Sequence, residues 1–307
     1  MQGPGFGKPS VGVVFDADFG NNIDDLLALG LLYGIESKSE GRVVSLSTSK
    51  SSLQSAALLD AMVKFYFGRP VPIGMPEAGK GSETTTILTA IPGKFPNGIK
   101  HLNDTADPAP AIRNAFTAHH DQNCIVLLSG PATNLASALA LPKVKELAAA
   151  KVRFLMVVAD DGLKSDLPAL NKVLSEWPTP ITFCGADIGE QVAFPGRSFE
   201  GEEFKWVPAT GHPVIEAYRA FKPMPYDASS TAMAAALHAV RPHEKYFGTS
   251  DAGVMSLKDS GELKFTPSAG GKHQQLVFDP AQKERALKAY VELLSIKPVQ
   301  RGFRRPS

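Results

Sequence analysis

Short apolar runs alternate with longer amphipathic stretches through the first two thirds of the chain. The apolar runs have the length of buried strands, are rich in Val, Ile and Leu, and lie at 11–16, 42–48, 124–129, 153–159 and 180–185. Stretches with helical spacing of their apolar residues follow the first four runs, at 24–35, 52–67, 131–141 and 167–177. Strands and helices in this order predict a parallel sheet with right-handed crossover connections.

The last third of the chain has a different order, which predicts a closing meander and a capping helix. Its expected elements are helices at about 212–221 and 228–240, short strands at 253–257, 263–267 and 274–279, and an amphipathic helix from Pro280 to about Ile296. The segment 76–107 is rich in Gly, Pro and Thr and is predicted to form a long surface loop. No repeat or linker divides the chain, so we expect one domain over 1–307.

Composition narrows the classes of function. The 32 basic and 31 acidic residues leave a formal charge of +1, and no basic run with interleaved aromatic residues indicates binding to nucleic acid. No apolar stretch approaches the roughly 20 residues that span a bilayer, so we expect no membrane segment. The opening MQGPGFGKPS lacks the pattern of a signal peptide, which leaves a cytoplasmic protein or an exported one whose leader was removed. Cys124 and Cys184 lie in apolar runs and are predicted to be buried free thiols.

The strongest chemical signal is FDADFGNNIDDLLAL at 15–29. Asp16 and Asp18 end the first predicted strand, and Asp24 and Asp25 open the helix that follows. Carboxylates this close repel one another unless a cation neutralises them, and hard oxygen ligands suit calcium or magnesium. Because open parallel sheets bind ligands at the carboxyl ends of their strands, the segment predicts a metal or catalytic site. The alternative, in which Asp24 and Asp25 only cap a helix, does not account for four carboxylates.

This segment resembles the aspartate signature of the inosine-uridine preferring nucleoside hydrolase family, in the longer form of some bacterial members. SGPATNLASAL at 129–139 is similar to the family's Gly-Pro-x-Thr-Asn-Leu motif, and MPYDASSTAMAAAL at 224–237 is similar to its late aspartate and the helix after it. The resemblance implies an α/β fold with an open, mostly parallel, Rossmann-like sheet and flanking helices. It also implies calcium-dependent hydrolysis of the N-glycosidic bond of a ribonucleoside or related N-riboside, as in purine and pyrimidine salvage.

The resemblance further implies a role for each matching residue. Calcium would be bound by the carboxylates of Asp18, Asp25 and Asp227 and by the main-chain carbonyl of Ser129. Asp18 would also accept a proton from the attacking water. The substrate contacts would be Asp24, Asn22 and Tyr226, with Asp16 and Asn134 supporting the ligands from behind. The partner would be a small nucleoside-like molecule, and the chain would form homodimers or homotetramers.

Plainer interpretations of these residues stay open at the level of sequence. Without the first motif, Asp227 is more typical of an N-cap before a helix starting near Ala228 than of a metal ligand. The residues from Ser129 to Asn134 alone are equally typical of an ordinary strand-to-helix turn.

Departures from the family pattern fall on the sugar pocket. After the second strand, where the family usually has an Asn that contacts ribose, this chain has Lys50, Ser51 and Ser52 instead. The family's Gly-rich loop and Glu-x-Asn pair are missing after 153–159, where the charged residues either refill the pocket in part or form a solvated loop. These charged residues are Asp160, Asp161, Lys164 and Asp166. Tyr226 replaces a His of many members, and Asn22 replaces an acidic residue. An intact ion site with an altered sugar pocket is therefore predicted.

Two alternative functions fit part of the sequence. VVFDADFG also resembles the Asp-x-Asp strand of haloacid dehalogenase-type phosphatases, with Asp16 as nucleophile, Asp18 as general acid and magnesium alongside. That interpretation leaves NNIDD, GPATNL and PYDASS unexplained. The second alternative is a catalytically weak or inactive nucleoside hydrolase-like protein that binds a ribose-containing ligand.

Overall fold

A mostly parallel sheet forms the centre of the computed structural model, which describes residues 10–66, 69–80, 83–258 and 260–298. Its ten strands are β1 (Val11–Ala17), β2 (Gly41–Thr48), β3 (Ile73–Gly74), β4 (Cys124–Ser129), β5 (Val152–Ala159), β6 (Ile181–Gly185), β9 (Gly248–Thr249), β10 (Gly253–Leu257), β11 (Leu263–Pro267) and β12 (His273–Val277). They follow the order β11-β10-β12-β6-β5-β4-β1-β2-β3, with β9 paired to β12. A separate ladder joins β7 (Phe194–Pro195) to β8 (Asp227–Ala228).

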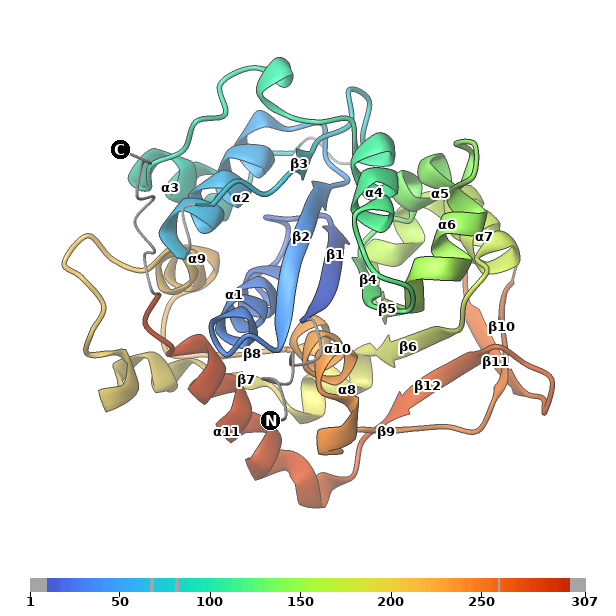
Figure 1. Cartoon of the computed structure of the whole chain (residues 1–307). Coiled ribbons are helices and arrows are strands. Elements are labelled where there is room, and N and C mark those ends of the chain that lie inside the picture. Colours follow the sequence, from blue (N-terminus) through green and yellow to red (C-terminus); the bar gives the residue numbers. More distant parts are fainter. Residues whose placement is uncertain (1–9, 67–68, 81–82, 259, 299–307) are drawn as a thin grey trace, which may run out of the picture.

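Helices cover both faces of this sheet (Figure 1). One face is covered by α4 (Pro108–Thr117), α5 (Thr133–Leu139), α6 (Val144–Lys151) and α7 (Leu167–Glu176). The other face carries α1 (Asp24–Ser37), α2 (Leu53–Tyr66), α3 (Thr86–Lys94), α8 (Ala186–Gln191), α9 (Pro213–Phe221), α10 (Thr231–Val240) and α11 (Lys283–Leu294). Alternate residues of β1 point to opposite faces of the sheet. Val13 and Phe15 pack in the core on the α1 side, and Val14 packs in the core on the α4 side.

The strand order reverses beside β1. This strand pairs in parallel with β2 on one side and with β4 on the other, where Ala17 is opposite Ser129. The chain passes from β1 to β2 and β3 before it returns to β4, so the connections after β1 and β4 leave in opposite directions. Such a switch point leaves a crevice at the carboxyl ends of the strands, where open α/β sheets bind ligands.

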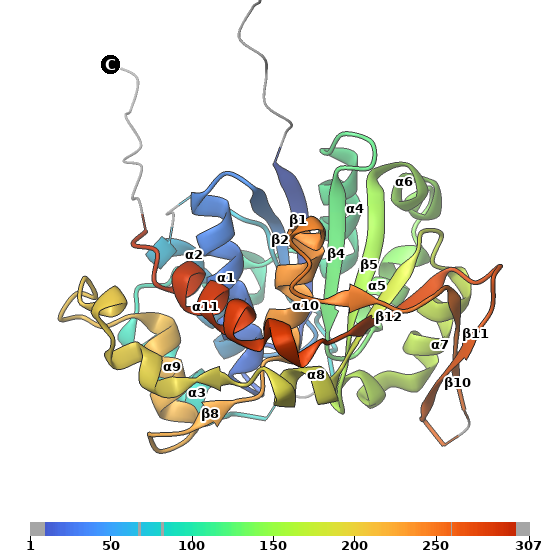
Figure 2. The same cartoon turned by 90° about the horizontal axis from the view of Figure 1, so that it is seen from below.

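The predicted parallel sheet with flanking helices is confirmed. The expected meander is also present, but β12 pairs in parallel with β6 and thereby joins the antiparallel strands β10 and β11 to the main sheet (Figure 2). Cys124 and Cys184 are buried and free, as expected. Among the described residues, no helix is long and apolar enough to cross a bilayer.

Two sequence predictions need correction, and one helix was not predicted. The segment 76–107 is not only loop, because α3 lies within it and begins where the Thr85 hydroxyl accepts a hydrogen bond from the N–H of Leu88. The predicted helix at 228–240 begins later, at Thr231, and Asp227 lies in β8 instead of capping it. The helix α4 was missed, although Asp107 as its cap and Pro108 as its first residue form a recognisable start signal.

Helix α1 is buried on all sides between the sheet and the outer helices. Every residue from Asp25 to Ile35 is buried, which explains why small residues occur along it. Gly34 is the tightest case, because a Cβ atom there would lie 2.0 Å from the main-chain oxygen of Leu293 in α11. The α1–α11 contact therefore requires the absence of a side chain at this position.

Gly34→Ala is expected to destabilise the protein by about 2 kcal/mol or more, because α11 must move away from α1. Gly93→Ala is the matched control, since a Cβ there meets nothing within 4 Å although Gly93 also lies in a helix. Urea unfolding of both variants measures the difference. Equal stability of the two variants would contradict the proposed packing.

Candidate active site

The carboxyl end of β1 carries a wholly buried carboxylate, Asp16. Its Oδ1 accepts a hydrogen bond of 2.8 Å from Nδ2 of Asn134, and the same amide donates to the main-chain oxygen of Thr48 at 3.0 Å. Asn134 belongs to α5, so a single side chain connects the ends of β1 and β2 with the helix after β4. Asp16 is 0% exposed, which does not favour the phosphatase alternative, where it would have to attack a substrate.

Asp18 lies just after β1, in the crevice at the switch point. Its N–H donates to the main-chain oxygen of Ser129 at 3.0 Å, and its Oδ2 accepts a hydrogen bond of 2.6 Å from Nδ2 of Asn21. Gly130 has φ +122°, and a Cβ there would lie 2.9 Å from the nitrogen of Asp18. The turn after β4 can therefore approach Asp18 only because residue 130 is glycine.

The start of α1 brings two more carboxylates to this crevice. Asn22 Oδ1 accepts hydrogen bonds from the N–H groups of Asp24 and Asp25, so it caps α1. The carboxylate of Asp24 accepts from the N–H groups of Ala232 at 2.7 Å and Met233 at 3.3 Å, in the first turn of α10. Asp24 thus connects the starts of two helices, a structural role that does not depend on substrate.

Asp25 is the most isolated carboxylate of the group. It is fully buried, and neither of its oxygens has a hydrogen-bond partner of good geometry. Burial, and then the negative charge of Asp18, raises the pKa of Asp25 well above its ordinary value, although the nearby hydroxyl of Ser129 opposes part of this rise.

Asp160, after β5, completes the acidic group. Its Oδ1 is buried without a partner, and Gly162 separates it from Asp18, since a Cβ at residue 162 would lie 3.2 Å from Asp160 Oδ1 and 3.3 Å from Asp18 Oδ2. The other charged residues of this segment point elsewhere: Asp161 and Lys164 form an exposed ion pair of 2.8 Å, and Asp166 caps α7. The charged segment is therefore divided, and only Asp160 faces the site.

Burial changes the proton affinity of the whole group. It raises the pKa of Asp16 and of Asp24 to about 7, and that of Asp160 to about 6. Burial also raises the pKa of Asp18, although the amide of Asn21 and the positive charge of Lys50 oppose the change. Five carboxyl groups near the switch point therefore have raised pKa values, and burial is the first cause in each case.

One basic side chain reaches the site. Lys50, two residues after β2, is 0% exposed, and its Nζ donates to Oδ1 of Asn21, whose amide nitrogen binds Asp18. Lys50 is a departure from the family pattern in the sequence, and its contact with Asn21 was not predicted. Asn21 was missed, although its position between two pairs of aspartates was a usable signal.

The residues predicted from the motif at 224–237 contact other elements than the acidic crevice. Asp227 is exposed on β8, and its Oδ1 accepts from the N–H of Gly196 at 3.3 Å. Tyr226 stacks on Tyr218 with ring centroids 4.2 Å apart and donates its hydroxyl to the main-chain oxygen of Tyr218 at 2.6 Å. The structure therefore brings Asp16, Asp18, Asp24 and Asp25 together, while the hydrogen bonds and ring contacts of Asp227 and Tyr226 described here are with other elements.

The residues at the crevice fit a divalent cation. Asp25 has two buried oxygens without partners, Asp18 lies beside it, and the carbonyl of Ser129 adds a neutral oxygen, which together match the oxygen ligands of calcium. No three His, Cys, Asp or Glu side chains among the described residues converge on one point as a metal site. The fit is thus to two carboxylates and a main-chain oxygen, with water or substrate completing the coordination.

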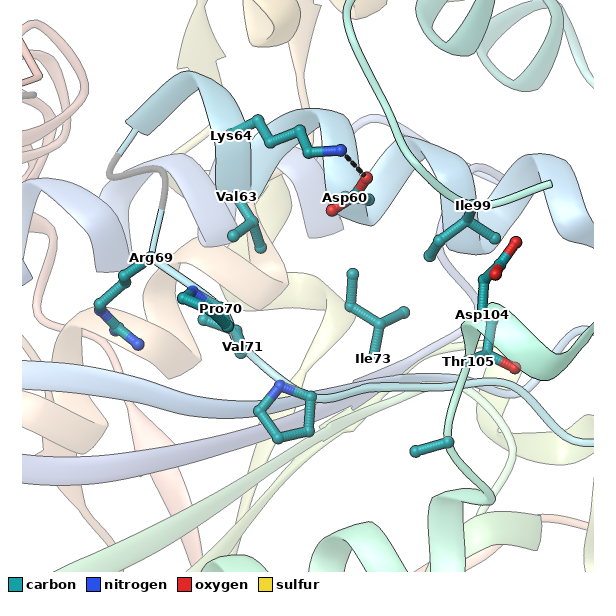
Figure 3. Close-up of a pocket in the computed structure, with 12 residues that line it drawn as sticks. Asp60, Val63, Lys64, Arg69, Pro70, Val71, Ile73, Ile99, Asp104 and Thr105 are labelled. Carbon is teal, nitrogen blue, oxygen red and sulfur yellow. Dashed lines mark hydrogen bonds and ion pairs between the residues drawn. The ribbon is translucent and has the colours of Figure 1, made fainter. Parts of the chain in front are cut away.

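Two pockets differ in their relation to this site. A pocket of about 500 Å³ adjoins Asp160 at the ends of β5 and β6, and Phe183, Asp187 and Gln275 are among the residues that line it. Another, of about 420 Å³, lies between α2 and β3, where Asp60, Ile73 and Ile99 face it (Figure 3). The first pocket shares Asp160 with the acidic group, whereas the second shares no residue with it.

Comparisons with solved structures identify the fold. A plant nucleoside hydrolase, PpNRh1, superposes with a TM-score of 0.71 at 16% identity over 94% of this chain and 99% of that one. An inosine-guanosine nucleoside hydrolase gives 0.72 at 15% identity over 92% and 98%. The inosine-uridine preferring nucleoside hydrolase from Bacillus anthracis gives 0.68 at 12% identity over 93% and 99%. Searches of the sequence against protein-family models and curated proteins found no match. The predicted nucleoside hydrolase fold is confirmed.

The raised pKa values predict how stability depends on pH when no metal is added. A carboxyl group with a raised pKa holds its proton more tightly in the folded state than in the unfolded state. Its contribution to the free energy of unfolding is therefore complete below about pH 4 and is lost as the pH rises to about 7. Asp16→Asn keeps the shape of the side chain but removes one such titration. The decrease in unfolding free energy from pH 4 to 7 should therefore be smaller in this variant, by on the order of 2 kcal/mol.

Urea unfolding in chelator at several pH values measures this slope. Asp251→Asn, at an exposed carboxylate remote from the crevice, is the control and should keep the wild-type slope. An Asp16→Asn profile parallel to that of the wild type would contradict the effect assigned to burial.

Proposed function

We propose that this chain hydrolyses the N-glycosidic bond of a ribonucleoside or related N-riboside, with calcium bound in the acidic crevice. The observation that carries the proposal is the pair of unpartnered, buried oxygens of Asp25 beside Asp18, at the switch point of a fold shared with nucleoside hydrolases. The proposed ligands are Asp18, Asp25, the carbonyl of Ser129, and Asp227. Asp227 is included because it precedes by a few residues the first turn of α10, which Asp24 binds.

The chemistry of the crevice follows from its charge. A bound calcium ion would lower the pKa of a neighbouring water and hold ribose hydroxyls. Asp18 accepts the proton of the attacking water, whose oxygen forms a bond to the anomeric carbon as the bond to the base nitrogen breaks. The positive charge that develops on the sugar ring is stabilised by the surrounding carboxylates, while the departing base takes up a proton.

The remaining residues position the substrate. Asp24 binds a ribose hydroxyl in this proposal while it keeps its hydrogen bonds to α10, and Asn22 and Tyr226 are the other proposed contacts. The pocket beside Asp160, with both aromatic and polar lining residues, has room for the base. Asp16 and Asn134 support Asp18 from behind through the ends of β1 and β2.

Asp18→Asn should reduce turnover by about 10²- to 10⁴-fold, because the amide cannot accept the proton of the water. Release of free base from a panel of purine and pyrimidine nucleosides, with calcium and with chelator, measures the effect. Asp251→Asn is the control and should retain wild-type turnover. An Asp18→Asn variant with full activity would contradict the proposed base. Ligand-induced stabilisation of the wild type without turnover would instead support the ribose-binding alternative.

Asp25→Asn should abolish measurable calcium binding, because it removes the charge of the buried ligand whose oxygens are without hydrogen-bond partners. Asp227→Ala should weaken binding. Isothermal titration of calcium into each variant, with folding checked by circular dichroism, measures both effects. Unchanged calcium binding by a folded Asp25→Asn variant would show that the ion binds at a place other than Asp25.

A further inference from the structure

Lys50 is held in place at the edge of the acidic crevice. The main-chain N–H of Lys50 donates to the hydroxyl of Thr48 at 3.2 Å. The main-chain N–H of the adjacent Ser49 donates to the main-chain oxygen of Ala17 at 3.0 Å. The N–H of Lys80 binds the oxygen of Ser49 at 2.8 Å. These contacts fix the backbone beside the end of β1, and the side chain is wholly buried.

A single amide connects this ammonium group to the site. Asn21 accepts from Lys50 Nζ through its oxygen and donates to Asp18 Oδ2 through its nitrogen at 2.6 Å. The orientation of the amide is therefore fixed by a cation on one side and an anion on the other. Burial lowers the pKa of Lys50, while the carboxylates of Asp18 and then Glu83 oppose this change and favour the charged ammonium.

The charge of Lys50 is of the same sign as that of a bound metal ion. Two cations that share one group of carboxylates repel each other, and they do so more strongly in a buried site than in water. No other Lys or Arg among the described residues is fully buried. The fixed ammonium therefore supplies part of the positive charge that the five carboxylates need.

We propose that Lys50 is a built-in cation of the crevice, which supports Asp18 through Asn21 and lowers the affinity of the site for a divalent ion. The inference rests on the ion site of the proposed function. Lys50 acts here as a positioning residue, since its contact with Asp18 passes through Asn21. The site then keeps part of its order without metal and binds calcium weakly.

The test compares the wild type with Lys50→Met, which retains the apolar stem but removes the charge. Calcium affinity, measured by isothermal titration, should increase by about tenfold or more in the variant. The melting temperature in chelator should decrease, and calcium should raise it by more than in the wild type. Lys64→Met is the matched control, because Lys64 forms a partly exposed ion pair with Asp60 and its loss should leave calcium affinity unchanged.

The outcomes of the titration distinguish the inference about Lys50 from the proposed calcium site itself. Tighter calcium binding by Lys50→Met alone supports the inference, including the case in which the wild type binds no calcium. Equal, measurable affinity in the wild type and the variant overturns the inference but leaves the ion site. Absence of binding in both overturns the inference and the ion site together. Should Lys50→Met fail to fold, Lys50→Gln keeps a donor for Asn21, removes the charge, and is judged by the same titration.

Discussion

Mutual repulsion of buried carboxylates at the end of β1 is the constraint on which the rest of the structure depends. Asp16, Asp18 and Asp25 are buried there, and Asp24 and Asp160 adjoin them. Each element that forms the crevice reduces the repulsion in its own way: α5 supplies an amide to Asp16, α10 supplies N–H groups to Asp24, and the segment after β2 supplies an ammonium group. Asp25 has only the nearby hydroxyl of Ser129 to oppose the effect of burial, and its oxygens are without hydrogen-bond partners, which makes it the position where a cation would have the largest effect.

The fold was predictable because its signals are local. β1 and β4 are buried along their whole length, and β2 and β5 are buried over most of theirs. Each contains a short apolar run, which is recognisable in the sequence. Their order along the chain then implies parallel pairing. Pairing between distant segments was less accessible: β12 lies beside β6 although about ninety residues separate them, and only the folded chain shows that the final meander extends the main sheet.

From the residues alone, the site was predictable where its members are close in sequence, while Ser129 and Asn134 were assigned to it only by the family resemblance. Asp16 to Asp25 form one segment, so their convergence is visible before folding. Asp160 and Lys50 enter from the ends of other strands, and whether a charged side chain there faces water or the crevice depends on the turn that carries it. Asp160 and Asp18 lie on either side of Gly162, whereas Asp161 is exposed and paired with Lys164. The direction in which such a side chain points is determined by tertiary packing and is not visible as a local sequence pattern.

The central claim is that the oxygens of Asp18 and Asp25 surround a divalent cation at the switch point of the sheet. A crystal structure of the protein grown with calcium and a ribose-like ligand tests it most directly. The account predicts a density peak about 2.4 Å from oxygens of Asp18, Asp25 and Ser129. An ion-free crevice at saturating calcium, with the carboxylates of Asp18 and Asp25 turned away from each other, would contradict it.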